Sequence, residues 1–288
     1  MAEAPLEGTT ADLVALLHEG GHVKVWSLIV TIFGDAILPR GGTVSALTLK
    51  RLTGMLGVSD GARRTALSRL AADGWVETAR VGRHAFYRLV EEGRETFERA
   101  SARIYAAPRH DPSRPGEGAE RMVAVLPEGT DAEAVALTHR GLRLDARTVL
   151  FEADAETRRA LANADAAILC GDARLPLWVG EAARAAQFPA RAPLDAFRSL
   201  PERMAPREAM VARTVLVHLW RRQCLRERDL PAGLADEEDR DLVARTYRRL
   251  LAPSEAWLDE YATGPHGPLP ASDAVRHRFS GQVLPERA

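Results

Sequence analysis

The chain has 288 residues, of which 46% are hydrophobic and 27% charged, and its formal net charge at pH 7 is −1. These values are typical of a water-soluble globular protein with about two or three domains. Its apolar runs are short and interrupted, which excludes a membrane-spanning segment, and its beginning lacks the basic and apolar regions of a signal peptide. The two cysteines, Cys170 and Cys224, are far apart in the sequence. We therefore expect buried thiols in a cytoplasmic protein, with no metal site and no cofactor.

The first forty residues predict a polar arm followed by a core helix. Residues 1–22 are polar, with only a modest helical pattern at 11–17, and predict a loose arm. The segment VKVWSLIVTIFGDAIL (23–38) is strongly apolar and predicts the first core helix of a domain. Arg40-Gly41-Gly42 then predicts a turn into the next helix.

Residues 45–72 carry the pattern of two short helices joined by a tight turn. In the first helix, three leucines share one face near helical spacing: Leu47, Leu52 and Leu56. Gly57 ends this helix, and Ser59 and Asp60 supply side-chain oxygens that cap the next one. The second helix, residues 61–72, places one stripe of apolar side chains inward: Ala62, Ala66, Leu67 and Leu70.

The outward face of the second helix and the hairpin after it predict DNA binding. That face carries Gly61, Arg64, Thr65 and Ser68. A helix needs such a polar face to enter a major groove and contact base edges. After Gly74, the runs WVETAR (75–80) and AFYRL (85–89) alternate around a turn and predict a hairpin whose tip holds Arg80, Arg83 and His84. Two helices followed by such a hairpin form a winged helix-turn-helix.

The local charge favours a nucleic-acid partner over a unit that only packs. Residues 45–90 contain eight Lys or Arg and three acidic residues, a balance of +5 that leaves −6 for the rest of the chain. Such an asymmetry is the electrostatic footprint of one nucleic-acid-binding module attached to a body that does not bind. A winged helix can also bind protein or nothing, so an interaction scaffold without specific DNA binding is the alternative.

After the hairpin, the chain predicts a connector and a small mixed domain. EEGRETFERASARIY (91–105) predicts an amphipathic helix with Phe97 and Ile104 inward, and Pro, Gly and charge at 106–119 predict a linker. The alternation of strands and helices over 120–192 predicts a small ferredoxin-like α+β domain. We expect strands at 121–129, 147–154, 166–171 and 176–181, and helices at 131–143 and 155–164. The first of these helices would place Ala134, Leu137 and Leu142 on one side.

The last third of the chain predicts a helical domain at 193–263 and a tail with little core at 264–288. AMVARTVLVHLWRRQCL (209–225) has a dense apolar stripe, and a second helix is expected at 242–262. Trp178, Trp220 and Trp257 are expected as core or interface anchors. The expected fold class is therefore α+β, with an N-terminal winged helix-turn-helix that includes the connector (23–105).

The chain resembles the PaaX family of bacterial transcriptional repressors. The resemblance rests on SLIVTIFGDAILPRGG (27–42) and VSDGARRTALSRLAADGWVETARVGRHAFYRL (58–89), and it continues through GRETFERASARIY (93–105). LVHLWRRQCLRERDLP (216–231) is a weaker match to the family's C-terminal domain. The family's tryptophan-rich segment is replaced by RHDPSRPGEGAERMVAV, and LADEEDRD follows Pro231. The resemblance implies a repressor of catabolic genes that is released by an acyl- or aryl-coenzyme A thioester.

On this interpretation, the double-stranded DNA operator is contacted by three groups of side chains. Arg64, Thr65 and Ser68 face base edges, and Arg83 and His84, with Arg80 nearby, lie at the minor groove or along the backbone. Cations that position the protein on phosphates are Lys50, Arg51, Arg63 and Arg69.

A regulated repressor also needs a partner subunit and an effector site. Operators are usually read by two-fold dimers, so we expect a homodimer, with the helices at 209–225 and after 242 as candidate interface. A phosphate-bearing effector needs cations, and the candidates cluster on or just after one predicted helix: Arg213, His218, Arg221, Arg222 and Arg226. The chain has no Gly-rich phosphate loop, HExxH motif, Cys pair or nucleophile elbow, so we expect no enzyme.

Overall fold

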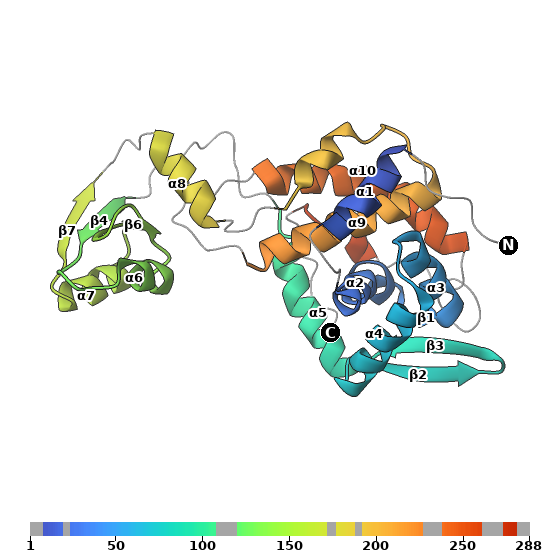
Figure 1. The fold of residues 1–288 in the computed structure, drawn as a ribbon. Coiled ribbons are helices and arrows are strands. Elements are labelled where there is room, and N and C mark those ends of the chain that lie inside the picture. The colour runs from blue at the N-terminus through green and yellow to red at the C-terminus, as the bar shows by residue number, and fades with distance from the viewer. Residues whose placement is uncertain are drawn as a thin grey trace. The chain divides into compact units, whose positions relative to one another are not determined.

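The computed structural model describes residues 8–19, 24–107, 120–171, 177–187, 192–226, 238–260 and 273–280. These residues form two compact units (Figure 1). Unit 1 comprises the described parts of Met1–Pro108, Ala192–Leu225 and Arg240–Ala288, and unit 2 those of Arg109–Arg191 and Arg226–Asp239. No helix among the described residues is long and apolar enough to cross a membrane.

Unit 1 begins with a helix where a loose arm was expected. Helix α1 (Gly8–Glu19) buries Leu13 and Leu17 in the core of its unit, because these two leucines lie one helical turn apart. Helix α2 (Val25–Ile32) continues as a π turn, η1 (Phe33–Ile37), and a 3₁₀ turn, η2 (Leu38–Arg40). This confirms the predicted first core helix.

The next part of unit 1 is two helices and a three-stranded antiparallel sheet. In chain order the elements are β1 (Thr43–Ser45), α3 (Ala46–Met55), α4 (Asp60–Ala72), β2 (Val76–Val81) and β3 (His84–Leu89). The strand order is β1-β3-β2. In Figure 1 the β2–β3 hairpin projects away from the helices of its unit. Both predicted helices and the hairpin are therefore present.

The remaining elements of unit 1 come from the connector and from the last third of the chain. They are α5 (Glu91–Ile104), η3 (Leu194–Ser199), α9 (Pro206–Cys224), α10 (Glu238–Glu260, with its first two residues in unit 2) and η4 (Asp273–Val275). As predicted, Phe97 and Ile104 of α5 face inward. Gly34 allows the close approach of α5, because a Cβ atom there would lie 2.6 Å from the Phe97 ring.

One hydrophobic core joins segments that the sequence assigned to separate domains. Apolar residues from 23–105 and from 193–263 belong to the same buried cluster. Helix α9 buries most of its length in this core, so its apolar stripe serves its own unit. The expected tail also contributes, since Phe279 is 1% exposed and packs in the same cluster. The physical reason is that α2 and α9 are buried over most of their lengths, and one neighbouring helix cannot cover so much of a helix's surface.

Unit 2 is a four-stranded antiparallel sheet with helices on its faces. Its elements are β4 (Arg121–Val125), α6 (Ala132–Thr138), β5 (Leu142–Arg143), β6 (Thr148–Glu152), α7 (Ala155–Asn163), β7 (Ala167–Gly171) and α8 (Leu177–Gln187). The strand order is β5-β6-β4-β7. Helices α6 and α7 pack on one face around Met122 and Phe151, and α8 packs through Val179 against Leu150 on the other face.

Three expectations for unit 2 are wrong. The strand expected at 176–181 belongs in its described part to helix α8, because a short apolar run does not distinguish a strand from a buried helix. The helix expected at 131–143 ends at Thr138, and it buries Ala132 and Ala136 while Leu137 is exposed. Leu142 instead lies in β5. Cys170 is exposed in β7, and only Cys224 is buried.

Candidate nucleic-acid interface

Local capping fixes the turn between α3 and α4. The Ser45 side chain accepts a hydrogen bond from Thr48 N at the start of α3, and Ser59 accepts one from Ala62 N at the start of α4. Gly57 adopts a positive φ of 75°, which a residue with a side chain rarely adopts. The predicted break at Gly57 and cap at Ser59 are therefore confirmed, whereas Asp60 does not cap α4 but is its first residue. Leu47 differs from the expectation, because it is 61% exposed while Leu49 takes the buried place.

The outward face of α4 is polar and exposed. Ala66, Leu67 and Leu70 are buried beneath it, as predicted. Gly61, Arg64, Thr65 and Ser68 are all exposed. Within the described residues, the side chains of Arg64, Thr65 and Ser68 make no hydrogen bond or ion pair. Their donors and acceptors are thus available to a partner.

The flanking cations are held by acidic and aromatic neighbours. Asp60, at the start of α4, pairs with Lys50 at 2.8 Å and with Arg63 at 2.5 Å. The hydrogen bonds from Lys50 and then Arg63 lower the pKa of the Asp60 carboxyl. Arg69 lies 3.6 Å from Asp73 and stacks over the Trp26 ring at 5.3 Å. Arg51 is half-buried and also has a partner, so contact with phosphate requires these cations to exchange or share partners.

The hairpin presents its basic residues at its tip. Gly82, with a φ of 59°, lies in the two-residue turn between Val81 and His84, which face each other in the strand pairing. Three predicted contact residues are exposed there: Arg80, Arg83 and His84. Farther from the tip, Arg88 pairs with Glu77 across the two strands.

The cations expected to hold an effector on or just after α9 divide into a group that bonds within unit 1 and a group that is exposed. Arg213 is 0% exposed and His218 is 1% exposed. His218 Nδ1 lies 2.9 Å from Thr31 Oγ1, and Arg221 donates to Ser27 Oγ at 2.7 Å, so both join α9 to α2. Burial, with smaller contributions from the charges of Arg221 and Arg222, lowers the pKa of His218 to about 3. Arg222 and Arg226 are exposed.

A buried carboxylate that the sequence analysis did not single out joins five segments of unit 1. Asp35, in the π turn η1, is 2% exposed. Arg213 Nε donates to its Oδ2 at 2.7 Å, and Arg278 Nη1 donates to its Oδ1 at 2.7 Å. The hydroxyls of Tyr105 and Tyr247 donate to the same Oδ1 at 2.7 Å and 3.0 Å. We call Asp35, Tyr105, Arg213, Tyr247 and Arg278 the Asp35 cluster.

Charge balance explains how this carboxylate stays ionised. Burial raises the pKa of Asp35, but the charges of Arg213 and then Arg278 outweigh burial, and the net pKa is lowered. Arg213 also pairs with Glu255 of α10. A charged residue inside the apolar run of residues 23–38 was the available signal, because an unpaired carboxylate is not tolerated there.

Comparison with known proteins identifies the family. The PaaX-like protein family matches residues 24–93, and the PaaX-like protein C-terminal domain matches residues 186–260. Over 296 aligned positions, the chain is 28% identical to the transcriptional repressor PaaX of Escherichia coli K12, covering 91% of this chain and 92% of that protein. The chain belongs to the PaaX family.

The described residues of the two PaaX-family regions lie mostly in unit 1. The first runs from the start of α2 through the hairpin, and the second includes α9 and α10. This membership makes the chain a transcriptional regulator and not an enzyme. An uncharacterized protein from Mycobacterium tuberculosis, Rv0674, matches 79% of this chain and 97% of its own, at 17% identity and a TM-score of 0.40. That TM-score is too low to support an argument about the fold.

Proposed function

We propose that this chain is a DNA-binding transcriptional repressor that acts in the cytoplasm as a homodimer on a double-stranded operator. The observation that carries the proposal is the outward face of α4. Arg64, Thr65 and Ser68 are exposed there without partners among the described residues, and the hairpin that follows α4 in the chain carries a basic tip. An unpaired polar face on the second of two successive helices is what base readout requires.

The topology of the two units supports a winged helix-turn-helix in unit 1 and a ferredoxin-like domain in unit 2. The order α2, β1, α3, α4, β2, β3 and the strand order β1-β3-β2 suit a winged helix-turn-helix, with α4 as the recognition helix and β2–β3 as the wing. The β-α-β-β-α-β order of β4 to β7 suits a ferredoxin-like domain.

The cations divide into base-reading and positioning residues. Arg64, with its planar guanidinium, pairs with guanine, and Thr65 and Ser68 add adaptable contacts. The other cations contact phosphates or the minor groove: Lys50, Arg51, Arg63, Arg69, Arg80, Arg83 and His84. The ion pairs of Lys50 and Arg63 with Asp60 lie at the start of α4, where the helix dipole also favours an anionic phosphate.

Release by an acyl- or aryl-coenzyme A thioester is the regulatory part of the proposal. Arg222, at the exposed end of α9, and Arg226, just after it, are its available cations. His218 and Arg221 connect α9 to α2, and Arg213 connects it to η1. A ligand that shifts α9 would act on α2, which also packs against α4. Such a shift would change how two α4 helices in a dimer are spaced.

Fluorescence anisotropy of the purified protein on its own upstream intergenic DNA tests the proposal. Random DNA serves as competitor, and the titration is repeated with a panel of acyl- and aryl-coenzyme A thioesters. We expect preference for the upstream DNA, a steep loss of affinity with salt, and release by one thioester. Specific binding that no thioester affects would refute the effector class alone. No preference for any fragment of the surrounding locus would refute the repressor and favour the interaction scaffold.

A further inference from the structure

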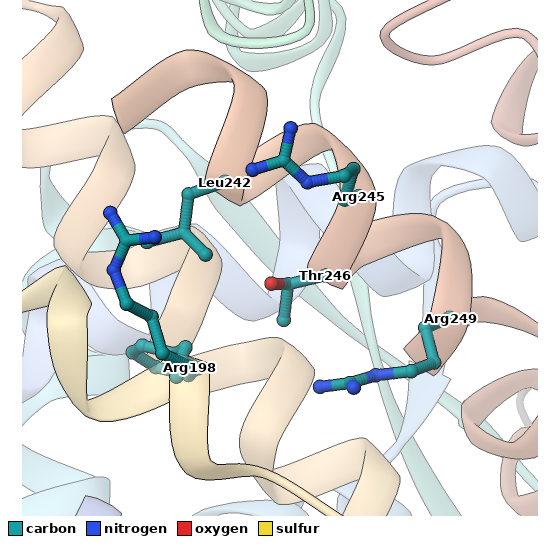
Figure 2. Close-up of a pocket in the computed structure, with 6 residues that line it drawn as sticks. Arg198, Leu242, Arg245, Thr246 and Arg249 are labelled. Carbon is teal, nitrogen blue, oxygen red and sulfur yellow. The ribbon is translucent and has the colours of Figure 1, made fainter. Parts of the chain in front are cut away.

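A hollow lined by arginines lies between η3 and α10 in unit 1. Its volume is about 360 Å³, within the range of small-molecule pockets. Six residues line it: Phe197, Arg198, Leu242, Arg245, Thr246 and Arg249. Figure 2 shows the side chains of Arg245, Thr246 and Arg249 extending from α10, with Arg198 facing them from η3.

One face of α10 carries two exposed arginines beside buried residues. Residues 242, 245, 246 and 249 follow the i, i+3, i+4, i+7 pattern of one helix face. Leu242 and Thr246 are buried on this face. Arg245 and Arg249 lie next to them in the pattern and are exposed. They are four positions apart and carry like charges, an arrangement that destabilises a helix unless an anion lies between them.

The polar groups of this face are free of internal partners. Within the part of the chain that the structure describes, neither Arg245 nor Arg249 has an ion pair or a side-chain hydrogen bond. Thr246 is only 4% exposed, yet its hydroxyl bonds to no carbonyl of the described residues. The hydroxyls of Thr31 and Thr214 instead donate to the carbonyl four residues earlier. Two guanidinium groups and one hydroxyl therefore remain available in the same hollow.

The remaining lining residues restrict the class of ligand. Phe197 and Leu242 are 1% and 6% exposed and supply an apolar floor. Arg198 adds a third guanidinium, part of whose charge is balanced by Asp195 at 2.9 Å. Arginine pairs in bidentate fashion with phosphoryl oxygens, and a hydroxyl adds one more donor. A concave site with an apolar floor suits a small molecule better than the phosphates of a DNA duplex.

We propose that this hollow binds a small molecule that carries a phosphoryl group beside an apolar moiety, with Arg245, Arg249 and Thr246 holding the phosphoryl oxygens. The cations assigned to an effector above lie on α9 or just after it, so the site on α10 is a separate one. If its ligand regulates DNA binding, that consequence rests on the proposed function. Binding of the ligand itself does not, and it is tested without DNA.

Isothermal titration calorimetry with inorganic pyrophosphate and with phenyl phosphate tests the site at constant ionic strength. The test variant is Arg245→Gln/Arg249→Gln. The matched control, Arg159→Gln/Arg276→Gln, removes the same charge from two exposed arginines outside the hollow that also lack internal ion pairs among the described residues. All four side chains are exposed, so both variants are expected to fold, and circular dichroism verifies this.

We expect saturable binding of both probes to the wild type and the control. The test variant should bind both probes at least about tenfold more weakly than the wild type does. Phenyl phosphate should also bind more tightly than inorganic phosphate, titrated as a reference without an apolar group, because of the apolar floor. The proposal is overturned if neither probe saturates, or if both variants lose affinity equally. It is also overturned if the test variant keeps its affinity for the probes and loses only affinity for DNA, because the arginines would then contact the DNA backbone. If the test variant binds DNA as tightly as the wild type does, the proposed function stands whether or not the probes bind.

Discussion

Replacing Asp35 by Asn should destabilise the protein far more than its one-atom change suggests. Asp35 accepts hydrogen bonds from two arginines and two tyrosines inside the core. Without the carboxylate charge, Arg278 has no ionic partner among the described residues, and Arg213 has only Glu255. Breaking a buried pair by removing one partner costs about 3–5 kcal/mol, because the other charge stays buried and unbalanced.

Urea unfolding at pH 7 measures this loss, and an exposed pair provides the control. Asp195 and Arg198 make the same kind of contact at 2.9 Å, but Asp195 is 77% exposed. Asp195→Asn should cost less than about 1 kcal/mol. Since the folded-state pKa of Asp35 is lowered, its contribution should persist at neutral pH and disappear as the pH falls below the ordinary value of a carboxyl. Equal losses for Asp35→Asn and Asp195→Asn would refute the account of the Asp35 cluster.

Three further outcomes follow from named contacts. Arg64→Ala should reduce discrimination between operator and mismatched DNA by about 1–3 kcal/mol, whereas Arg83→Ala should weaken binding to both DNAs similarly. Competition titrations measure both effects, and equal effects of the two changes would contradict that division. Because the folded-state pKa of His218 is lowered to about 3, its stabilising effect is complete above pH 6.5 and declines on acidification. Between pH 6.5 and pH 5 the wild type should therefore lose about 2 kcal/mol of unfolding free energy that the His218→Gln variant retains. Urea unfolding of both proteins at several pH values checks this, and parallel stability profiles would contradict it. Trp220→Phe removes the 2.8 Å hydrogen bond from Nε1 to the Ile104 carbonyl and should cost about 1–3 kcal/mol in urea unfolding, whereas an unchanged midpoint would show that the bond contributes nothing.

Local patterns were sufficient to predict the α4 face. The Ser59 cap, the Gly57 break and the Ala66–Leu70 stripe involve neighbours within a few residues, so the chain specifies them without knowledge of the fold. The same holds for the hairpin and for α9. Periodicity misplaced Leu47 because a single apolar residue at a helix start does not determine which side is covered.

Long-range contacts could not be predicted in this way. Asp35 meets partners 178 and 243 positions away, and no local pattern indicates that Arg213 and Arg278 neutralise it. For the same reason, the sequence suggested an effector-binding role for Arg213 and a tail with little core for the segment that carries Phe279. Local reasoning likewise separated a DNA-binding domain from a helical domain, whereas one core serves both segments.

The central claim is that the exposed face of α4 reads DNA, and the ratio of affinities for operator and random DNA tests it most directly. The test variant is Arg64→Ala/Thr65→Ala/Ser68→Ala, compared with the wild type by anisotropy after equal stability is verified in urea. The account predicts that the ratio falls close to one, while binding to random DNA persists through the hairpin and flanking cations. A triple variant that folds normally and keeps the wild-type ratio would contradict it.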